Sequence, residues 1–225
     1  MMKLTQEQTQ YIFDYVSSRD IKWYELQVEL TDHMVSSMEE IWEKDPELTF
    51  HQVKQYAENN FTGDSSFKSI EKERTEILGK EFRKEQWKMI GEYLKFPKIF
   101  ASIIVVFLTF KISLYFEEPR KFVAGLFLFL IFVAIPMVYS YYKNRKIDGN
   151  RFIEIEKSNP LTLLFGGFIN FGLSLGNVFK EEINEYALVL FLFCCLWALT
   201  VLCLITGILL QNKTIKRVKE QYQLN

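Results

Sequence analysis

The stretch from Ala187 to Leu210 constrains the fold more than any other part of the chain. Its 24 residues, ALVLFLFCCLWALTVLCLITGILL, include no charged side chain. As a helix it would rise about 36 Å at roughly 1.5 Å per residue, which exceeds the ~30 Å hydrocarbon core of a bilayer. A surface helix of a soluble protein keeps a polar face, and this stretch has none. We therefore predict that it crosses a membrane.

The charges divide the chain into two parts, although the net charge of all 225 residues is only −1. Residues 1–95 hold 13 Lys and Arg against 19 Asp and Glu, whereas residues 96–225 hold 14 against 9. The first part is predicted to be an acidic domain, and the second a membrane region with basic connections. An acidic domain also argues against nucleic acid as a partner, because the phosphate backbone requires a basic face.

Helical periodicity runs through residues 1–95, and no segment alternates as a strand would. Capping boxes at Thr5/Gln8 and Thr49/Gln52 predict the starts of two helices, and Asp20 is a candidate N-cap for the helix between them. The apolar face of that middle helix consists of Tyr24, Val28, Val35, Met38 and Ile41, widened by Leu26, Leu30 and Met34.

This middle helix also carries the one constellation that suggests binding chemistry. The i, i+4 spacing places Glu25, Glu29 and His33 on one face, with Asp32 adjacent. Such a face would make a partial metal site, but no second histidine or cysteine lies nearby, so we favour a polar face that bonds locally. Together with Glu39, these residues form an acidic surface that is predicted to bind a protein partner in the cytosol.

A turn at residues 62–64 is expected to lead into a fourth, long helix. The end of this helix, residues 80–95, mixes basic with apolar side chains, among them Lys84, Trp87 and Lys88. This composition is typical of a helix at an anionic lipid surface, where basic side chains reach toward the headgroups. The alternative is an ordinary solvated helix that packs its apolar stripe on the domain.

Four apolar segments follow, at residues 97–116, 122–142, 161–179 and 187–210. Asn159-Pro160 predicts the N-cap and first residue of the third segment. That segment has 19 residues and carries Asn170, Ser174 and Asn177, so a re-entrant segment is the alternative to a full crossing. The predicted fold is therefore all-α: a cytosolic helical domain over residues 1–95 and a four-helix transmembrane bundle over residues 96–225.

Lys and Arg residues in the connections predict the orientation of the bundle. Fifteen of them lie in residues 80–98, in residues 143–157 and after Gln211, whereas only three lie in the other two connections. Basic connections stay in the cytoplasm, so both termini are predicted to be cytoplasmic. The segments outside the cytoplasm would then be short.

Several residues inside the predicted spans bear on function. Lys111 lies near the outer end of its segment and suits an interfacial anchor, with an ion pathway as the alternative. Pro136 is expected to kink its helix. Gly172 and Gly176 favour close helix packing, within the bundle or in a homo-oligomer, and Asn170 could add an interhelical hydrogen bond. A small transporter using Lys111, Pro136 and Asn170 is therefore a competing hypothesis, as is a structural subunit of a larger complex.

Motifs for catalysis and cofactor binding are missing from the sequence. It contains no Walker A loop, GxGxxG, HExxH or GxSxG. The three cysteines, Cys194, Cys195 and Cys203, all lie in the last apolar segment, where packing is their expected role. The sequence thus predicts a non-enzymatic protein with no catalytic residue, metal or cofactor.

The sequence of residues 24–33, YELQVELTDH, with Glu39-Glu40 and the helix start at Thr49, resembles the short helical HAAS-type domains of small bacterial membrane proteins. The resemblance covers residues 4–65, and it departs from the family pattern at residues 45–48, where a glycine-containing turn is usual. It implies a regulatory or signalling adaptor in the bacterial inner membrane and assigns no catalytic residue.

Overall fold

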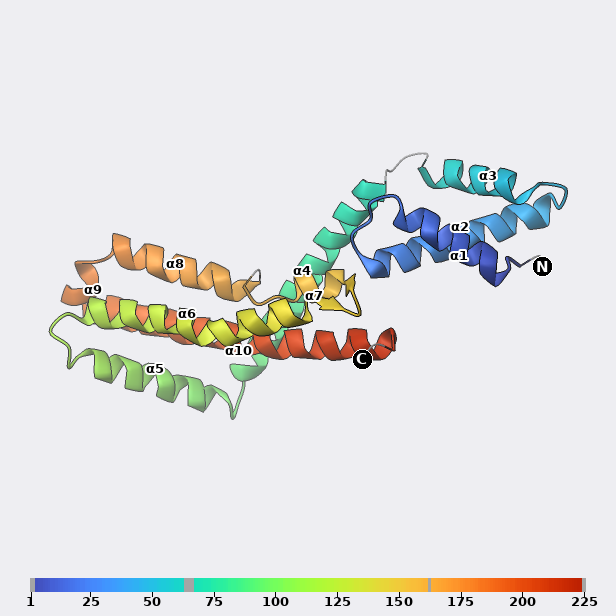
Figure 1. Ribbon diagram of the computed structural model, residues 1–225. Coiled ribbons are helices and arrows are strands. Elements are labelled where there is room, and N and C mark those ends of the chain that lie inside the picture. The colour runs from blue at the N-terminus through green and yellow to red at the C-terminus, as the bar shows by residue number, and fades with distance from the viewer. Residues whose placement is uncertain (1–2, 63–66, 162, 224–225) are drawn as a thin grey trace. The chain divides into compact units, whose positions relative to one another are not determined.

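The computed structural model describes residues 3–62, 67–161 and 163–223 (Figure 1). These residues form ten helices and one pair of two-residue strands, so the predicted all-α class is confirmed. The elements are α1 (Gln6–Ser17), α2 (Tyr24–Lys44), α3 (Phe50–Thr62), α4 (Phe67–Tyr93), α5 (Ile99–Ser113), α6 (Pro119–Asn144), β1 (Lys146–Ile147), β2 (Asn150–Arg151), α7 (Ile153–Lys157), α8 (Leu164–Val178), α9 (Glu182–Glu185) and α10 (Ala187–Gln221).

The chain divides into two compact units. The first contains Met1–Ile77 and Gly149–Ile153, and the second contains Leu78–Asp148 and Glu154–Asn225. This division differs from the expected boundary after Lys95, because the second half of α4 buries Phe82 and Ile90 in the apolar clusters of the second unit. The end of α4 therefore packs its apolar stripe on other helices of the second unit.

Helices α1, α2 and α3 form the core of the first unit. Their buried side chains recur at helical spacing, namely Ile12, Val16, Leu26, Leu30, Met34, Met38, Val53 and Ala57. Both predicted capping boxes are confirmed: Thr5 and Gln8 exchange side chain to backbone hydrogen bonds at the start of α1, and Thr49 and Gln52 do so before α3. Gly63 and Asp64 of the predicted turn lie outside the described residues.

The start of α2 corrects one prediction. The helix begins at Tyr24 with Trp23 as its N-cap, and no side chain hydrogen-bonds to that cap. Asp20 has φ +61°, in the left-handed region, so it lies in the turn after α1 and its predicted N-cap role is wrong. Residues 21–23 precede the helix without regular structure, and Ile21 and Trp23 are both buried in the core.

In the second unit, α5, α6, α8 and α10 run side by side, and α10 contacts each of the other three (Figure 1). Two apolar clusters line the contacts. One includes Leu130, Ala134, Phe165, Cys203 and Leu204, and the other includes Val123, Phe127, Ile183, Leu190 and Phe193. Helix α6 runs without interruption through Pro136.

Two helices of the second unit, α6 and α10, are long and apolar enough to cross a membrane. Helices α5 and α8 have 15 residues each, which gives only about 22 Å of helix. The described residues therefore show two candidate spanning helices where four were predicted. Asn159 shortens α8, because its side chain accepts a hydrogen bond from the Leu161 N–H at 3.1 Å and closes a turn. The predicted N-cap and first-residue roles of Asn159-Pro160 are thus wrong.

Helix α10 extends well beyond the predicted span. It continues past Leu210 to Gln221, a total of 35 residues and roughly 52 Å. The residues after Gln211 were predicted to form a basic cytoplasmic tail, and within this stretch Thr214, Ile215 and Val218 are buried. The tail is a helical extension because these side chains continue the i, i+4 stripe of the span.

Candidate functional site

The short segment Gly149–Ile153, which follows α6 and β1, is part of the first unit. Phe152 and Ile153 are each only 1% exposed. The Phe152 ring packs edge-on against Tyr24 with 5.7 Å between ring centroids, and the Arg151 guanidinium lies 5.4 Å from the centre of the Trp23 ring. Residues at the start of α2 therefore contact a segment that lies between α6 and α8 in the sequence. We call the contacts of residues 23–25 with residues 151–153 the loop clasp.

Glu25 supplies the polar contact of the loop clasp. Its Oε2 accepts a hydrogen bond from the backbone N–H of Ile153 at 2.7 Å. Ile153 is the first residue of α7, so no carbonyl of that helix can satisfy this donor. A carboxylate is a strong acceptor for such a group. Glu25 was predicted to contact a partner, whereas the structure uses it inside the first unit.

The other residues of the predicted acidic surface are separated by the fold. Glu39 accepts a hydrogen bond from the Leu4 N–H at 3.0 Å and so fixes the chain before α1. Glu29 lies 3.9 Å from Arg74, with both side chains about half exposed. Asp32 and His33 are exposed. Within the described residues, no three His, Cys, Asp or Glu side chains gather where they could hold a metal.

A cavity of about 560 Å³ lies between α1 and α2, and we call it the α1–α2 groove. It is lined by Leu4, Gln6, Thr9, Gln10, Phe13, Val28, Thr31, Asp32 and Val35. Val28 and Val35 belong to the apolar face predicted for α2, but the core uses the neighbouring stripe from Leu26 to Met38. The groove therefore combines apolar side chains with amides, hydroxyls and one exposed carboxylate, that of Asp32.

Tyr15, Arg19 and Glu58 join α1 to α3. The Tyr15 hydroxyl donates to Glu58, and Arg19 donates to both, with 2.5 Å between Arg19 Nη2 and Glu58 Oε1. Lys54 Nζ lies 3.6 Å from the centre of the Tyr15 ring. Burial and the hydrogen bond to Glu58 raise the pKa of the Tyr15 phenol above its ordinary value. Tyr15 therefore stays protonated at neutral pH and serves as a structural donor.

Gln86 forms a buried polar junction in the second unit. Its side chain is fully buried, and its Nε2 donates to the Cys203 carbonyl at 2.8 Å. Its Oε1 accepts a hydrogen bond from the Leu164 N–H at 3.3 Å. One side chain of α4 thus connects the middle of α10 to the first turn of α8, where backbone donors have no helical partner.

The lysines and the tryptophan predicted at the membrane interface lie on the outer side of α4. Lys84 and Lys88 are exposed, and Trp87 is 46% exposed. The Trp87 ring packs edge-on against Phe168 of α8 with 6.0 Å between centroids. Trp87 therefore packs on α8 while nearly half of the residue remains exposed.

The residues of the transporter hypothesis face outward. Lys111, Pro136 and Asn170 are all exposed, and Lys111 Nζ lies 5.6 Å from the centre of the Phe107 ring. Asn170 accepts a hydrogen bond from Ser174 of the same helix at 3.4 Å, where an interhelical bond was expected. A cavity of about 70 Å³ between α6, α8 and α10 is lined by other residues, among them Arg120 and Asn177.

The two glycines predicted to permit close packing differ in their surroundings. A Cβ on Gly172 would lie 2.4 Å from Cε1 of the Phe127 ring on α6, whereas a Cβ on Gly176 would meet Phe193 at an ordinary 3.8 Å. Of these two glycines, Gly172 is therefore the one whose surroundings leave no room for a Cβ.

Three important residues were not found from the sequence: Gln86, Arg151 and Phe152. Gln86 carries a local signal, because it stands four residues after Phe82 and four before Ile90, within an apolar stripe. Arg151 and Phe152 carry none, because their contacts lie more than a hundred residues away.

No protein-family model, curated protein or solved structure matches this chain. The resemblance to HAAS-type domains therefore stays a prediction that rests on residues 4–65.

Replacing Glu25 by glutamine is expected to loosen the loop clasp. The neutral amide is a weaker acceptor for the Ile153 N–H, so local stability should fall by about 1–2 kcal/mol. Hydrogen exchange of residues 149–157 in the full chain measures the effect. Glu29→Gln is the control, since an exposed pair at 3.9 Å contributes little. Equal protection in both variants would show that the carboxylate is not needed.

Proposed function

We propose that this protein is a non-enzymatic, multi-pass membrane protein whose N-terminal helical domain binds a protein partner in the cytosol. The observation that carries the membrane location is the exposure of the apolar helices. Only 28% of the most apolar window of α6, and 39% of that of α10, is buried within the protein. A core helix of a soluble protein would be mostly buried.

The two units differ sharply in what they expose, which supports this location. In the first unit the described large apolar side chains that are exposed are Tyr11, Tyr56 and Ile77. The second unit exposes many more on its apolar helices, among them Phe100, Ile104, Phe107, Leu108, Phe129, Phe132, Ile135, Phe171, Leu188 and Leu192. Apolar surface of this extent requires a lipid or protein cover.

The ends of the second unit support cytoplasmic termini. The basic connections meet at one end, where Lys213 pairs with Glu85 at 2.7 Å and Arg217 pairs with Glu154 at 2.6 Å. The two connections poor in Lys and Arg meet at the other end, where the Arg120 N–H donates to Asn184 at 3.0 Å. This separation of basic connections from less basic ones fits the positive-inside rule. It also fits four crossings, in which the turns that flank α5 and α8 would add to the length of these 15-residue helices.

The α1–α2 groove supports a partner-binding role for the first unit. Residues 1–77 carry 8 Lys and Arg against 16 Asp and Glu, so the unit attracts a basic partner. The apolar walls at Phe13, Val28 and Val35 would accept the apolar face of a helix, and Asp32 would meet a cation on its edge. The partner we propose is therefore a basic amphipathic segment of another protein. The loop clasp links its binding site to the chain between α6 and α8.

Accessibility of introduced cysteines tests the membrane topology. In a background with Cys194, Cys195 and Cys203 replaced by alanine, Glu117→Cys should react with a membrane-impermeant maleimide in intact cells. Lys216→Cys should react only after the membrane is permeabilised. A chain that is found in the soluble fraction, or the opposite labelling pattern, would overturn the proposed topology.

Binding of a basic amphipathic helical peptide tests the adaptor role. The full chain in nanodiscs of neutral phosphatidylcholine should bind this peptide and discriminate against a version with Glu in place of each Lys. Asp32→Lys should weaken binding by about five-fold or more, because a like charge then faces the peptide. The control is Glu40→Lys, at an exposed position of α2 that does not line the groove. Equal binding of both peptides would count against the proposal.

A further inference from the structure

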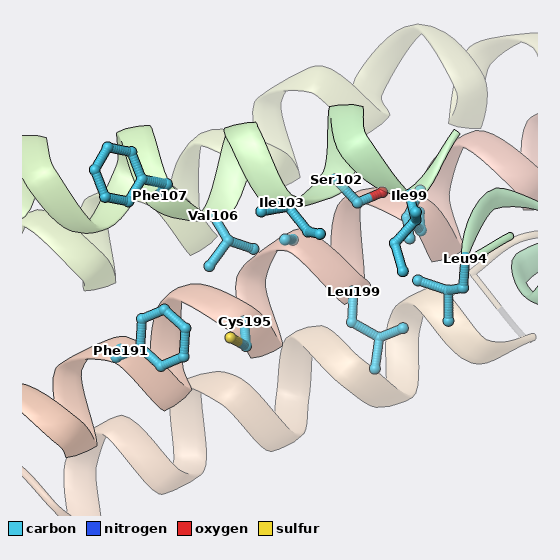
Figure 2. A pocket seen from close by; sticks show the side chains of 11 residues that line it. Leu94, Ile99, Ser102, Ile103, Val106, Phe107, Phe191, Cys195 and Leu199 are labelled. Carbon is cyan, nitrogen blue, oxygen red and sulfur yellow. The ribbon is translucent and has the colours of Figure 1, made fainter. Parts of the chain in front are cut away.

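An apolar groove runs between α5 and α10 in the second unit, and Figure 2 shows its side chains facing one another from the two helices. Its volume is about 460 Å³. The α5 wall includes Ile99, Ile103, Val106 and Phe107, and the α10 wall includes Phe191, Cys195, Ala198, Leu199 and Leu202. Leu94, in the turn after α4, and Ser102, the single hydroxyl, complete the lining. We call it the α5–α10 groove.

The basic end of this groove carries a cluster of lysines. Leu94 and Ile99 line the groove, and Lys95 and Lys98 are the residues next to them in the chain. Lys95 Nζ lies 2.7 Å from Glu92, and Lys98 Nζ lies 4.9 Å from the centre of the Tyr93 ring. All three charged side chains are exposed.

The Glu92 carboxyl lies among positive charges at this end of the groove, and they lower its pKa. The hydrogen bond from Lys95 lowers the pKa of the Glu92 carboxyl, and the charges of Lys95, Lys98 and Lys88 add to the effect. Three lysines therefore surround one carboxylate, which leaves an excess of positive charge beside the mouth of an apolar groove. An apolar groove whose lining residues Leu94 and Ile99 are next in the chain to Lys95 and Lys98 complements a molecule with a hydrocarbon chain and an anionic head.

We propose that the α5–α10 groove binds one anionic phospholipid, with an acyl chain between α5 and α10 and the phosphate at Lys95 and Lys98. This inference rests on the membrane location under the proposed function. The basic end of the second unit then faces the cytoplasmic leaflet, where anionic lipids attract lysines near the membrane surface. A neutral lipid would fill the groove without satisfying the lysines, so the site selects by charge.

Native mass spectrometry of the full chain tests the lipid site. The protein is exchanged into detergent containing equal amounts of dioleoyl phosphatidylglycerol and dioleoyl phosphatidylcholine. The wild type should retain one phosphatidylglycerol in preference. Lys95→Gln with Lys98→Gln should reduce that preference by about five-fold for each lysine removed. Lys216→Gln with Lys219→Gln, on the last turns of α10, is the matched control and should keep the preference.

A second pair of variants tests the groove itself. Val106→Trp fills it and should displace the lipid, whereas Val105→Trp, at the neighbouring residue that does not line the groove, should retain it. Circular dichroism and gel filtration confirm that both variants fold, and the lysine variants test the site independently of them. An excess of sn-glycerol 3-phosphate should not compete, because it has no acyl chain.

Three results would overturn the lipid proposal. They are equal retention of both lipids by the wild type, displacement by glycerol phosphate, and a dimer mass without lipid, which would mean that a second copy covers the groove. If the protein is found in membranes but shows one of these results, the lipid site is wrong and the proposed membrane location still stands. A protein that is not found in membranes fails at the earlier step.

Discussion

Gln86→Ala is expected to lower the free energy of unfolding of the second unit by about 2–4 kcal/mol, the largest effect of any single substitution considered for this chain. Alanine leaves a cavity at a fully buried position and leaves the Leu164 N–H without its acceptor. The measurement is denaturant-induced unfolding of the full chain in mixed micelles, followed by circular dichroism.

Two further variants separate volume from hydrogen bonding at this junction. Gln86→Leu restores most of the volume but neither hydrogen bond, so it should still cost about 1–3 kcal/mol. Lys84→Ala, at an exposed position on the same helix, should change stability by less than about 0.5 kcal/mol. If the leucine variant is as stable as the wild type, the bonds to Cys203 and Leu164 contribute nothing to stability.

Gly172→Ala is expected to destabilise the packing of α8 on α6 by about 1–2 kcal/mol. The added methyl group would lie 2.4 Å from Cε1 and 2.6 Å from Cζ of the Phe127 ring, which is 1% exposed, so this buried ring would have to shift. Overpacking of this kind costs about 1–3 kcal/mol, and the better helix propensity of alanine offsets at most about 1 kcal/mol of it.

Gly176→Ala is the control, and its expected change in stability is opposite to that of Gly172→Ala. Its added Cβ meets Phe193 at 3.8 Å, so only the gain in helix propensity remains and stability should rise slightly. Thermal unfolding of both variants in the same detergent compares them directly. If Gly172→Ala is the more stable of the two, the contact with Phe127 is not a tight one.

The parts of the fold that depend on neighbouring residues could be predicted from the sequence. The capping boxes at Thr5 and Thr49 require only residues three positions apart, and both are present. The apolar character of α6 and α10 could likewise be read directly. The length of each apolar helix was harder to predict, because polar residues that look like helix starts can close turns, as Asn159 does.

The candidate sites depend on distant contacts, and here the sequence was a weaker guide. The acidic residues of α2 form one face by spacing, yet Glu25 and Glu39 are engaged by Ile153 and Leu4, and Asp32 faces a groove. Spacing shows which side chains share a face, but it does not show which of them another segment will occupy. The basic residues after Leu210 likewise suggested a solvated tail, although Thr214, Ile215 and Val218 recur at helical spacing and extend α10.

The loop clasp has a consequence for the order in which the protein can be assembled. Glu25 leaves the ribosome long before Ile153, its hydrogen-bond partner 128 residues further along the chain. Helices α5 and α6 are translated in the interval, and under the membrane location proposed above their apolar surfaces require the bilayer as soon as they emerge. The first unit can begin to fold early, but the contact between Glu25 and Ile153 has to wait for this stretch. If α5 and α6 insert as proposed, membrane insertion precedes completion of the domain that was synthesised first.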